Sequence, residues 1–97
     1  MTELRFEWDP RKSRANLSKH GVSFDEAATV FYDEAAVQFY DPDHSEDENR
    51  FILLGVSLRL RILVVCHCFR ESEAVVRIIS ARRADKDEEA DYWRRRS

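Results

Sequence analysis

The amino-acid sequence predicts an α+β fold, in which a small antiparallel sheet of four to five strands packs with helices in the order β-α-α-β-β-β-β-α. Two observations carry this prediction. Helix-start signals and an i, i+3, i+4, i+7 apolar stripe occupy the first third of the chain, whereas apolar residues recur with a period of two from residue 35 to residue 80. The expected strands are residues 4–8, 36–40, 50–57, 60–69 and 74–80, and the expected helices are residues 10–19, 24–32 and 84–96.

The first expected helix starts directly after a short strand. Asp9 can accept hydrogen bonds from the first free backbone amides, and Pro10 suits the first helical position. Gly21 ends the helix, because glycine readily adopts the left-handed conformation that follows a helix. His20, the residue before it, is expected to cap the last carbonyls or to meet the helix dipole. Few apolar side chains lie on this helix, so we expect it at the surface.

The second expected helix begins with a capping box, in which Ser23 is the cap and Glu26 returns the hydrogen bond. Its apolar side chains form one stripe, at Phe24, Ala27, Ala28 and Phe31. A stripe with this spacing is typical of a helix that turns one face to the hydrophobic core.

Four consecutive strands follow, because apolar and polar residues alternate through most of the next segment. A polar loop dense in acids, residues 41–49, separates the first two of them, and residues 71–73 are expected to form the last turn. The final helix is polar. We expect it to dock through Ala90 and Trp93, with Tyr92 as a further contact.

Length and composition predict one domain, residues 1–97, because 97 residues with 43% hydrophobic content suffice for one core. No apolar run approaches the roughly 18 residues of a membrane helix, and no apolar signal segment follows the first residues, so we expect a cytoplasmic protein. Cys66 and Cys68 are expected to be buried free thiols. With His67 on the opposite strand face they do not supply four zinc ligands, so we expect no metal and no cofactor.

Charge is distributed unevenly along the chain. Residues 1–49 carry 5 Lys and Arg against 12 Asp and Glu, whereas residues 50–97 carry 11 against 7, so the net charge of −3 combines −7 and +4. Ten of the 11 cations in the second half are Arg, whose planar fork of donors fits phosphate. This asymmetry indicates a surface that faces a polyanion; the alternative is a set of solvated faces with local ion pairs.

Five blocks of sequence, in a particular order and spacing, resemble a known family. The blocks are Phe6-Glu7-Trp8-Asp9-Pro10-x-Lys12, then Asn16-x-x-x-His20-Gly21-Val22-Ser23-Phe24-x-Glu26-Ala27, then Asp41-Pro42-Asp43-His44-Ser45-x-x-Glu48-x-Arg50, then Gly55-x-Ser57 with Arg61-x-Leu63-Val64-Val65-x-His67, and finally Arg77-Ile78-Ile79-Ser80-Ala81-Arg82-Arg83-Ala84 with Tyr92 beyond it. Over about residues 5–93, the chain thus resembles the BrnT-type toxins of bacterial type II toxin–antitoxin modules.

This resemblance implies a RelE-like fold and a ribonuclease activity that arrests translation. It also implies a BrnA-type antitoxin, with a ribbon-helix-helix DNA-binding part, that neutralises the toxin and represses the shared operon. Two features depart from the family pattern. Leu60 stands where such sequences commonly have Gly, which predicts a different hairpin turn, and residues 85–89 make the start of the last helix acidic.

Cleavage of RNA without a metal requires a base for the 2′-hydroxyl, cations for the phosphorane and an acid for the departing 5′-oxygen. The candidates for handling the phosphate are Arg61, Arg77, Arg82 and Arg83, and the candidates for proton transfer are His44 and Glu48. Arg61 opens the longest expected strand, and Arg77 interrupts an apolar one. Arg82 and Arg83 are expected at a strand-to-helix junction, where free helix amides would help to hold a phosphate.

The candidates for substrate binding are Lys12, His67 and Tyr92. Each candidate also has a structural alternative. Lys12 would be solvated, His67 would be a core histidine and Tyr92 would dock the last helix. His44 would brace its loop, and Glu48 would pair with an arginine. The alternative function is accordingly a module without catalysis, which binds the antitoxin and acts as a co-repressor.

Overall fold

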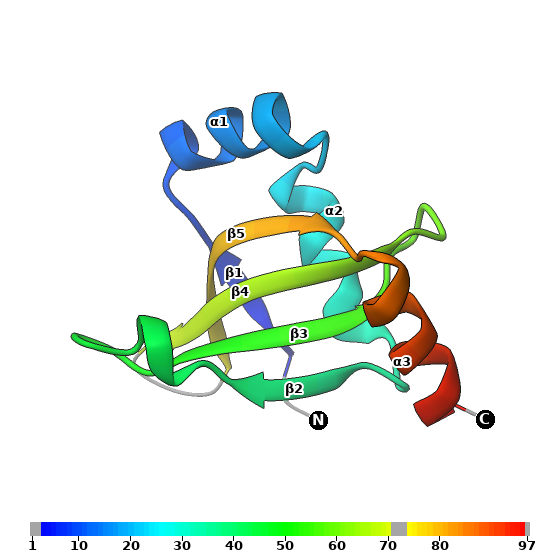
Figure 1. Ribbon diagram of the computed structural model, residues 1–97. Helices are drawn as coiled ribbons and strands as arrows, with labels where there is room; N and C mark the ends of the chain where they lie inside the picture. The colour runs from blue at the N-terminus through cyan, green and yellow to red at the C-terminus, as the bar shows by residue number, and fades with distance from the viewer. Residues whose placement is uncertain (1–2, 71–73, 97) are drawn as a thin grey trace.

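The computed structural model describes residues 3–70 and 74–96, which form a five-stranded sheet with helices on both faces (Figure 1). The strand order is β1-β5-β4-β3-β2. The strands are β1 (Arg5–Glu7), β2 (Val37–Tyr40), β3 (Arg50–Val56), β4 (Ile62–Arg70) and β5 (Val75–Arg83). The helices are α1 (Pro10–His20), α2 (Phe24–Thr29) and α3 (Lys86–Arg96), with 3-10 turns η1 (Val30–Tyr32) and η2 (Pro42–His44). The expected turn at residues 71–73 lies outside the described residues.

The sheet is mixed, so the expectation of an antiparallel sheet is wrong at one edge. β1 pairs in parallel with β5, with Arg5 opposite Val75 and Glu7 opposite Arg77. The pairings of β2 with β3, β3 with β4 and β4 with β5 are antiparallel. Side chains alternate in the same way in both kinds of pairing, so the sequence pattern does not specify strand direction.

The main hydrophobic core lies between α2 and one face of the sheet, which we call the inner face. Its fully buried side chains include Phe24, Ala27, Val30, Leu63 and Val65, which confirms the apolar stripe of the second helix. The helix itself is shorter than expected. It ends at Thr29, whose hydroxyl donates to the Glu26 carbonyl at 2.6 Å, and the chain continues as the 3-10 turn η1.

α3 lies against the opposite, outer face, where it covers one end of the sheet (Figure 1). Tyr92 anchors it, because its ring is fully buried and its hydroxyl donates to the Asp33 carboxylate at 2.6 Å. Asp33 also accepts two backbone N–H groups, so this carboxylate joins α3 to β3 and to the segment before β2. Trp93 is half-exposed and Ala90 is exposed, so the expectation that these two residues dock the helix is wrong.

A β-bulge in β5 changes which of its side chains share a face. The register between β4 and β5 shifts between Cys66 and His67, which leaves Ile79 as an extra residue in β5. Ile78 and Ala81 consequently both face the inner core, although they are three residues apart. The alternation of side chains is therefore reversed beyond the bulge.

This reversal places Arg77 and Arg82 on the outer face together, although they are five residues apart. β5 continues to Arg83, three residues beyond its expected end, so Arg82 and Arg83 are the last residues of the strand. Since α3 starts at Lys86, they lie at the strand-to-helix junction as expected. Asp85 caps the first turn of α3, since its carboxylate accepts a hydrogen bond from the Glu88 N–H at 2.8 Å. The expected help from free helix amides is thus not supported.

The turn between β3 and β4 explains why position 60 suits glycine. Leu60 has a φ of 62°, in the left-handed region that glycine adopts without strain. Its N–H donates to the Ser57 carbonyl, and the Ser57 N–H donates to the Arg61 carbonyl, both at 2.9 Å. This arrangement is a three-residue hairpin loop, and its left-handed position carries Leu in this chain.

Candidate active site

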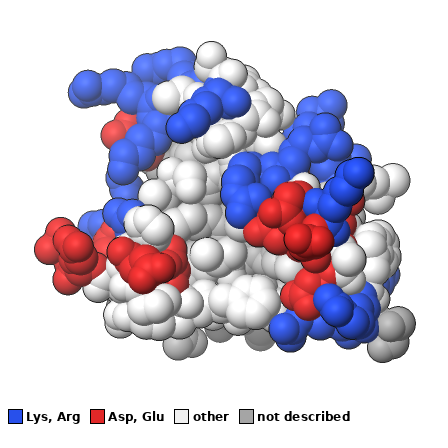
Figure 2. Space-filling view, in the orientation of Figure 1, with Lys and Arg blue, Asp and Glu red and all other residues white. Residues whose placement is uncertain are grey.

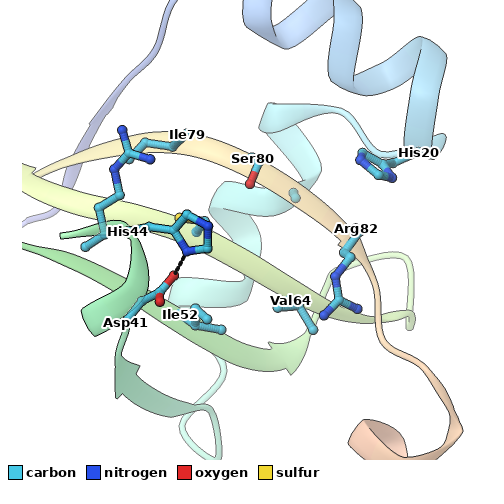
Figure 3. Close-up of a pocket in the computed structure, with 11 residues that line it drawn as sticks. His20, Asp41, His44, Ile52, Val64, Ile79, Ser80 and Arg82 are labelled. Atoms are coloured by element: carbon cyan, nitrogen blue, oxygen red, sulfur yellow. Dashed lines mark hydrogen bonds and ion pairs between the residues drawn. The ribbon is translucent and has the colours of Figure 1, made fainter. Parts of the chain in front are cut away.

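The outer face carries an open hollow of about 270 Å³ over β3, β4 and β5, beside η2 and the end of α1 (Figure 3). We call it the outer-face hollow. Its floor is partly apolar, with Ile52 and Val64, and the side chains around it that carry proton-transfer or charge chemistry are His20, Asp41, His44, Arg50 and Arg82. Figure 2 shows this region as a pale area between cations over α1 and acids over the loop that follows β2 and over the start of α3.

Asp41 and His44 form a carboxylate–imidazole pair on one wall of the hollow. His44 Nδ1 lies 2.9 Å from Asp41 Oδ2. The Asp41 side chain is 12% exposed and the His44 side chain 66%. The carboxylate is therefore largely buried in the wall of the hollow, whereas the imidazole ring is open to solvent. Ser45 braces this turn, because its hydroxyl donates to the Asp41 carbonyl and accepts from the Arg50 N–H. With Nδ1 held by Asp41, Nε2 is the ring nitrogen that a substrate meets.

Arg82 lies at the other end of the hollow and is held by α3. Its Nη1 and Nη2 donate to the two Glu88 carboxylate oxygens at 2.8 and 2.9 Å. The same hydrogen bonds hold the pKa of Glu88 below its ordinary value. The Arg82 side chain is 45% exposed, and within the described residues its Nε–H and one N–H of Nη2 have no protein acceptor. These donors are available to a phosphate oxygen.

Arg50 lines the hollow, although it appeared in the sequence motifs and not among the candidate site residues. Its Nε is buried and has no hydrogen-bond partner in the described part of the chain, and the nearest carboxylate oxygen of Glu48 lies 3.7 Å away. A buried donor without an acceptor is unfavourable, so the arrangement favours an incoming anion. The spacing Glu48-x-Arg50 in the third sequence block was the signal that could have identified it.

His20 is the second site residue that sequence reasoning placed elsewhere. The structure does not use it as the helix cap, because Gly21 adopts φ 69° and its N–H bonds to the Leu17 carbonyl at 2.9 Å. The ring instead lines the outer-face hollow, on the side opposite His44 (Figure 3). In a sequence, a histidine beside the glycine that ends a helix is typical of a capping residue. In the structure, α1 approaches β5, and this approach places the His20 ring in the lining of the hollow.

Arg61 does not lie in the hollow, contrary to its expected place in the phosphate site. Its guanidinium binds both oxygens of the Glu26 carboxylate and the Gly21 carbonyl. Glu26 is 4% exposed, also accepts from Ser57, and its pKa is held below its ordinary value chiefly by Arg61. The Ser23 half of the capping box is confirmed at 3.0 Å, but the Glu26 side chain turns to Arg61 in place of the reciprocal bond.

His67 and Tyr92 are fully buried, so neither side chain reaches a bound RNA in this structure. His67 Nε2 lies 3.0 Å from Gln38 Oε1, and its ring packs among Phe31, Phe51 and Phe69. Burial lowers the pKa of His67, so the neutral ring is favoured. His67 is thus a core histidine and Tyr92 docks the last helix, as the structural alternatives for these two residues predicted.

The remaining candidates lie outside the hollow. Arg77 shares the outer face but pairs with Glu7 at 3.7 Å, near the β1 edge. Arg83 is exposed on the side of β5 that bears the inner core, Lys12 is exposed on α1, and Glu48 lines an adjacent acidic pocket that shares His44 with the hollow. Of the nine candidate side chains, the structure therefore brings His44 and Arg82 together around the hollow.

The outer-face hollow also has a cysteine in its lining. Cys66 lines it as a free thiol and Cys68 is buried as one, and burial raises the pKa of both, so the thiol forms are favoured. Within residues 3–70 and 74–96, no three or more His, Cys, Asp or Glu side chains are grouped as metal ligands would be. None of the described helices has the length and apolar character needed to cross a membrane.

The sequence and the fold are each similar to those of known proteins. A sequence model of the family described as "Ribonuclease toxin, BrnT, of type II toxin-antitoxin system" matches residues 8–88. The crystal structure of the Brucella abortus ribonuclease toxin BrnT is similar to the fold, with a TM-score of 0.65 and 24% identity over 86% of this chain and 99% of that chain. No curated protein matches the sequence.

Proposed function

This chain belongs to the BrnT family of ribonuclease toxins of type II toxin–antitoxin systems, and on that premise we propose that it is a metal-independent endoribonuclease whose active site is the outer-face hollow. The observation that supports this proposal is the Asp41–His44 pair, which shares one hollow with Arg50 and Arg82. An oriented imidazole beside two cations supplies the base and the charge stabilisation that transesterification at a phosphodiester requires.

In the proposed reaction, His44 Nε2 removes the proton of the 2′-hydroxyl. Asp41 holds Nδ1, fixes the ring orientation and stabilises the imidazolium that forms. The 2′-oxygen attacks the adjacent phosphorus, and Arg82 and Arg50 stabilise the additional charge on the phosphorane oxygens. The products are a 2′,3′-cyclic phosphate and a 5′-hydroxyl. Lys12 and Arg77, outside the hollow, would contact the flanking RNA backbone.

The proposal extends to the biology of the family. Cleavage of RNA in the cytoplasm would arrest translation, and a BrnA-type ribbon-helix-helix antitoxin would neutralise the protein. Arg82 lines the hollow, so an antitoxin that covers this face would block access of RNA to the proposed site.

The test is cleavage of RNA by the purified protein, with EDTA present and with mass spectrometry of the products. We expect cleavage that EDTA does not abolish and a 2′,3′-cyclic phosphate at the new end. Arg82→Ala should lower the rate by about 100-fold or more, because it removes a cation from the transition state. Arg83→Ala, a neighbouring change on the other strand face, should have an effect at least about tenfold smaller. Equal losses would contradict the placement of the site.

A second candidate function, binding of a partner without catalysis, is favoured by one observation. Leu58 and Leu60 are 81% and 85% exposed beside Tyr32, which is 63% exposed, around a groove at the β3–β4 turn. Exposed apolar groups of this kind mark protein interaction sites. Enhanced operator binding by the antitoxin in the presence of this chain, with no RNA cleavage by the chain alone, would favour this second function.

A further inference from the structure

The outer-face hollow contains a second imidazole that the reaction described above leaves unused. We propose that His20 is the general acid that protonates the departing 5′-oxygen, on the opposite side of the phosphate from His44. This inference rests on the proposed ribonuclease function and assigns a further residue to it. The observations that carry it are the anchoring of α1, the unused ring nitrogens of His20 and the position of the ring in the hollow.

Asn16 fixes the end of α1 over the bulged part of β5. Its side-chain amide donates to the Ala81 carbonyl at 2.8 Å and to the Val22 carbonyl at 2.9 Å, and its oxygen accepts from the Ala81 N–H at 3.1 Å. β1 pairs with β5 only as far as Arg77, so Asn16 satisfies backbone groups of β5 beyond the end of that pairing. All three hydrogen bonds are buried, and the two to Ala81 hold α1 to a strand 65 residues away.

His20 takes its position from this anchor. Residues four apart lie on the same face of a helix, so His20 is placed one turn beyond Asn16 on the side that faces β5. The ring accordingly lines the hollow together with Ser80, Ala81 and Arg82. Gly21, the residue after His20, is held as well, because the Arg61 guanidinium donates to the Gly21 carbonyl at 3.1 Å.

The ring of His20 has no structural task in the described part of the chain. No hydrogen bond to either ring nitrogen is present among residues 3–70 and 74–96, and the helix is capped by the Gly21 N–H. The residue is half-buried, so a substrate in the hollow has access to the ring. An imidazole is able to donate or accept a proton near neutral pH.

The relative positions of the two rings suit in-line displacement. The attacking 2′-oxygen and the departing 5′-oxygen must lie on opposite sides of the phosphorus, so the base and the acid must approach from opposite sides. His20 comes from α1 and His44 from η2, and Figure 3 shows them on either side of Ser80 at the same hollow. Arg82 lines the hollow with both of them.

The proton balance of the reaction is complete with these two residues. His44 accepts the proton of the 2′-hydroxyl, the bond between the 2′-oxygen and phosphorus forms, and the bond between phosphorus and the 5′-oxygen breaks. His20 in its imidazolium form gives a proton to the 5′-oxygen. The enzyme then holds one imidazolium at His44 and one neutral imidazole at His20, and exchange of protons with water restores the first state.

The experiment compares two leaving groups in an RNA oligonucleotide that contains a cleavage site mapped with the wild-type protein. In one oligonucleotide the scissile bond is natural, and in the other the 5′-oxygen at that bond is replaced by sulfur. A thiolate leaves without protonation, so the acid is needed for the natural bond alone. His20→Gln should lower the rate on the natural bond by about 100-fold or more, but on the sulfur-substituted bond by less than about tenfold.

Two further variants complete the design. His44→Gln should lower the rate on both oligonucleotides, because the base is needed whatever the leaving group. Ser18→Gln, a change on an exposed part of the same helical turn, should leave both rates within about twofold. The thermal midpoint of His20→Gln should stay close to that of the wild type, since its ring makes no hydrogen bond within the described residues.

The proposal is overturned if His20→Gln cleaves the natural bond as fast as the wild type, or if it loses the same factor on both oligonucleotides. The second result would assign His20 to binding or positioning. If the wild-type protein cleaves no RNA at all, the failure belongs to the proposed function as a whole.

Discussion

The two faces of the sheet use the same residue types in opposite ways. On the inner side, the 4%-exposed Glu26 carboxylate holds Arg61, and His67 is enclosed by aromatic rings. On the outer face, Arg82 pairs with a more exposed glutamate, Glu88, and His44 projects from the wall of a hollow. The comparison teaches that burial, and not residue type, separates the arginines and histidines that hold this fold together from those that a substrate meets.

The two Arg–Glu pairs give the largest expected difference in stability. Arg61→Ala removes the main charge partner of the buried Glu26 carboxylate, so the free energy of unfolding should fall by about 3 kcal/mol. Arg82→Ala breaks a pair exposed to solvent and should cost less than about 1 kcal/mol. Urea denaturation of double-mutant cycles on both pairs measures the two coupling energies. Coupling energies of equal size would contradict the distinction between the faces.

The buried histidine gives a smaller effect that depends on pH. Burial lowers the pKa of His67 from 6.5, so below pH 6.5 the unfolded chain binds a proton at this position that the folded chain does not. The contribution of His67 to the free energy of unfolding is therefore fully present above pH 6.5. It is lost as the pH falls toward the pKa that His67 has in the folded chain. Between pH 7 and pH 5, the wild type should lose about 1 kcal/mol more than His67→Phe. Denaturant titrations at several pH values would contradict this if both proteins lost stability in parallel.

The smallest expected effect concerns the exposed turn between β3 and β4. Leu60→Gly removes the strain of a left-handed Leu, so the free energy of unfolding should rise by about 0.5–1 kcal/mol and the thermal midpoint by a few degrees. Leu58→Gly is the matched control, because Leu58 is similarly exposed but has no positive φ. A rise for Leu58→Gly, or none for Leu60→Gly, would show that the turn carries no strain at this position.

Local signals predicted most of the elements correctly. Asp9 and Ser23 cap their helices as expected, with hydrogen bonds of 2.8 and 3.0 Å, and Gly21 adopts the left-handed conformation. Period-two alternation predicted the four consecutive strands, with ends that differ by up to three residues. These features depend on neighbours within about four positions, which is why the sequence contains them.

The candidate site was predicted less well. His44 and Arg82 were identified and do share the hollow, whereas Arg50 and His20 line it without having been chosen. Arg61 and Arg82 look alike in the sequence, since each is an arginine close to one end of an expected strand. Their different partners, Glu26 and Glu88, lie 35 and six residues away, and only the shorter separation lies within the range of a local pattern.

By itself, the sequence determined where the first two helices begin, which stripe of the second helix faces the core, and which family the chain resembles, because these depend on local propensities and on a linear order of motifs. The tertiary structure decided the parallel edge strand, the bulge that turns Arg77 and Arg82 to one face, and the position of His20 beside the hollow. Each of these depends on polar groups far apart in the chain being paired, as the Asn16 side chain and the Ala81 backbone are across 65 residues. Such pairings have no local signature, because the energy of a hydrogen bond depends on distance in space and not on separation along the chain.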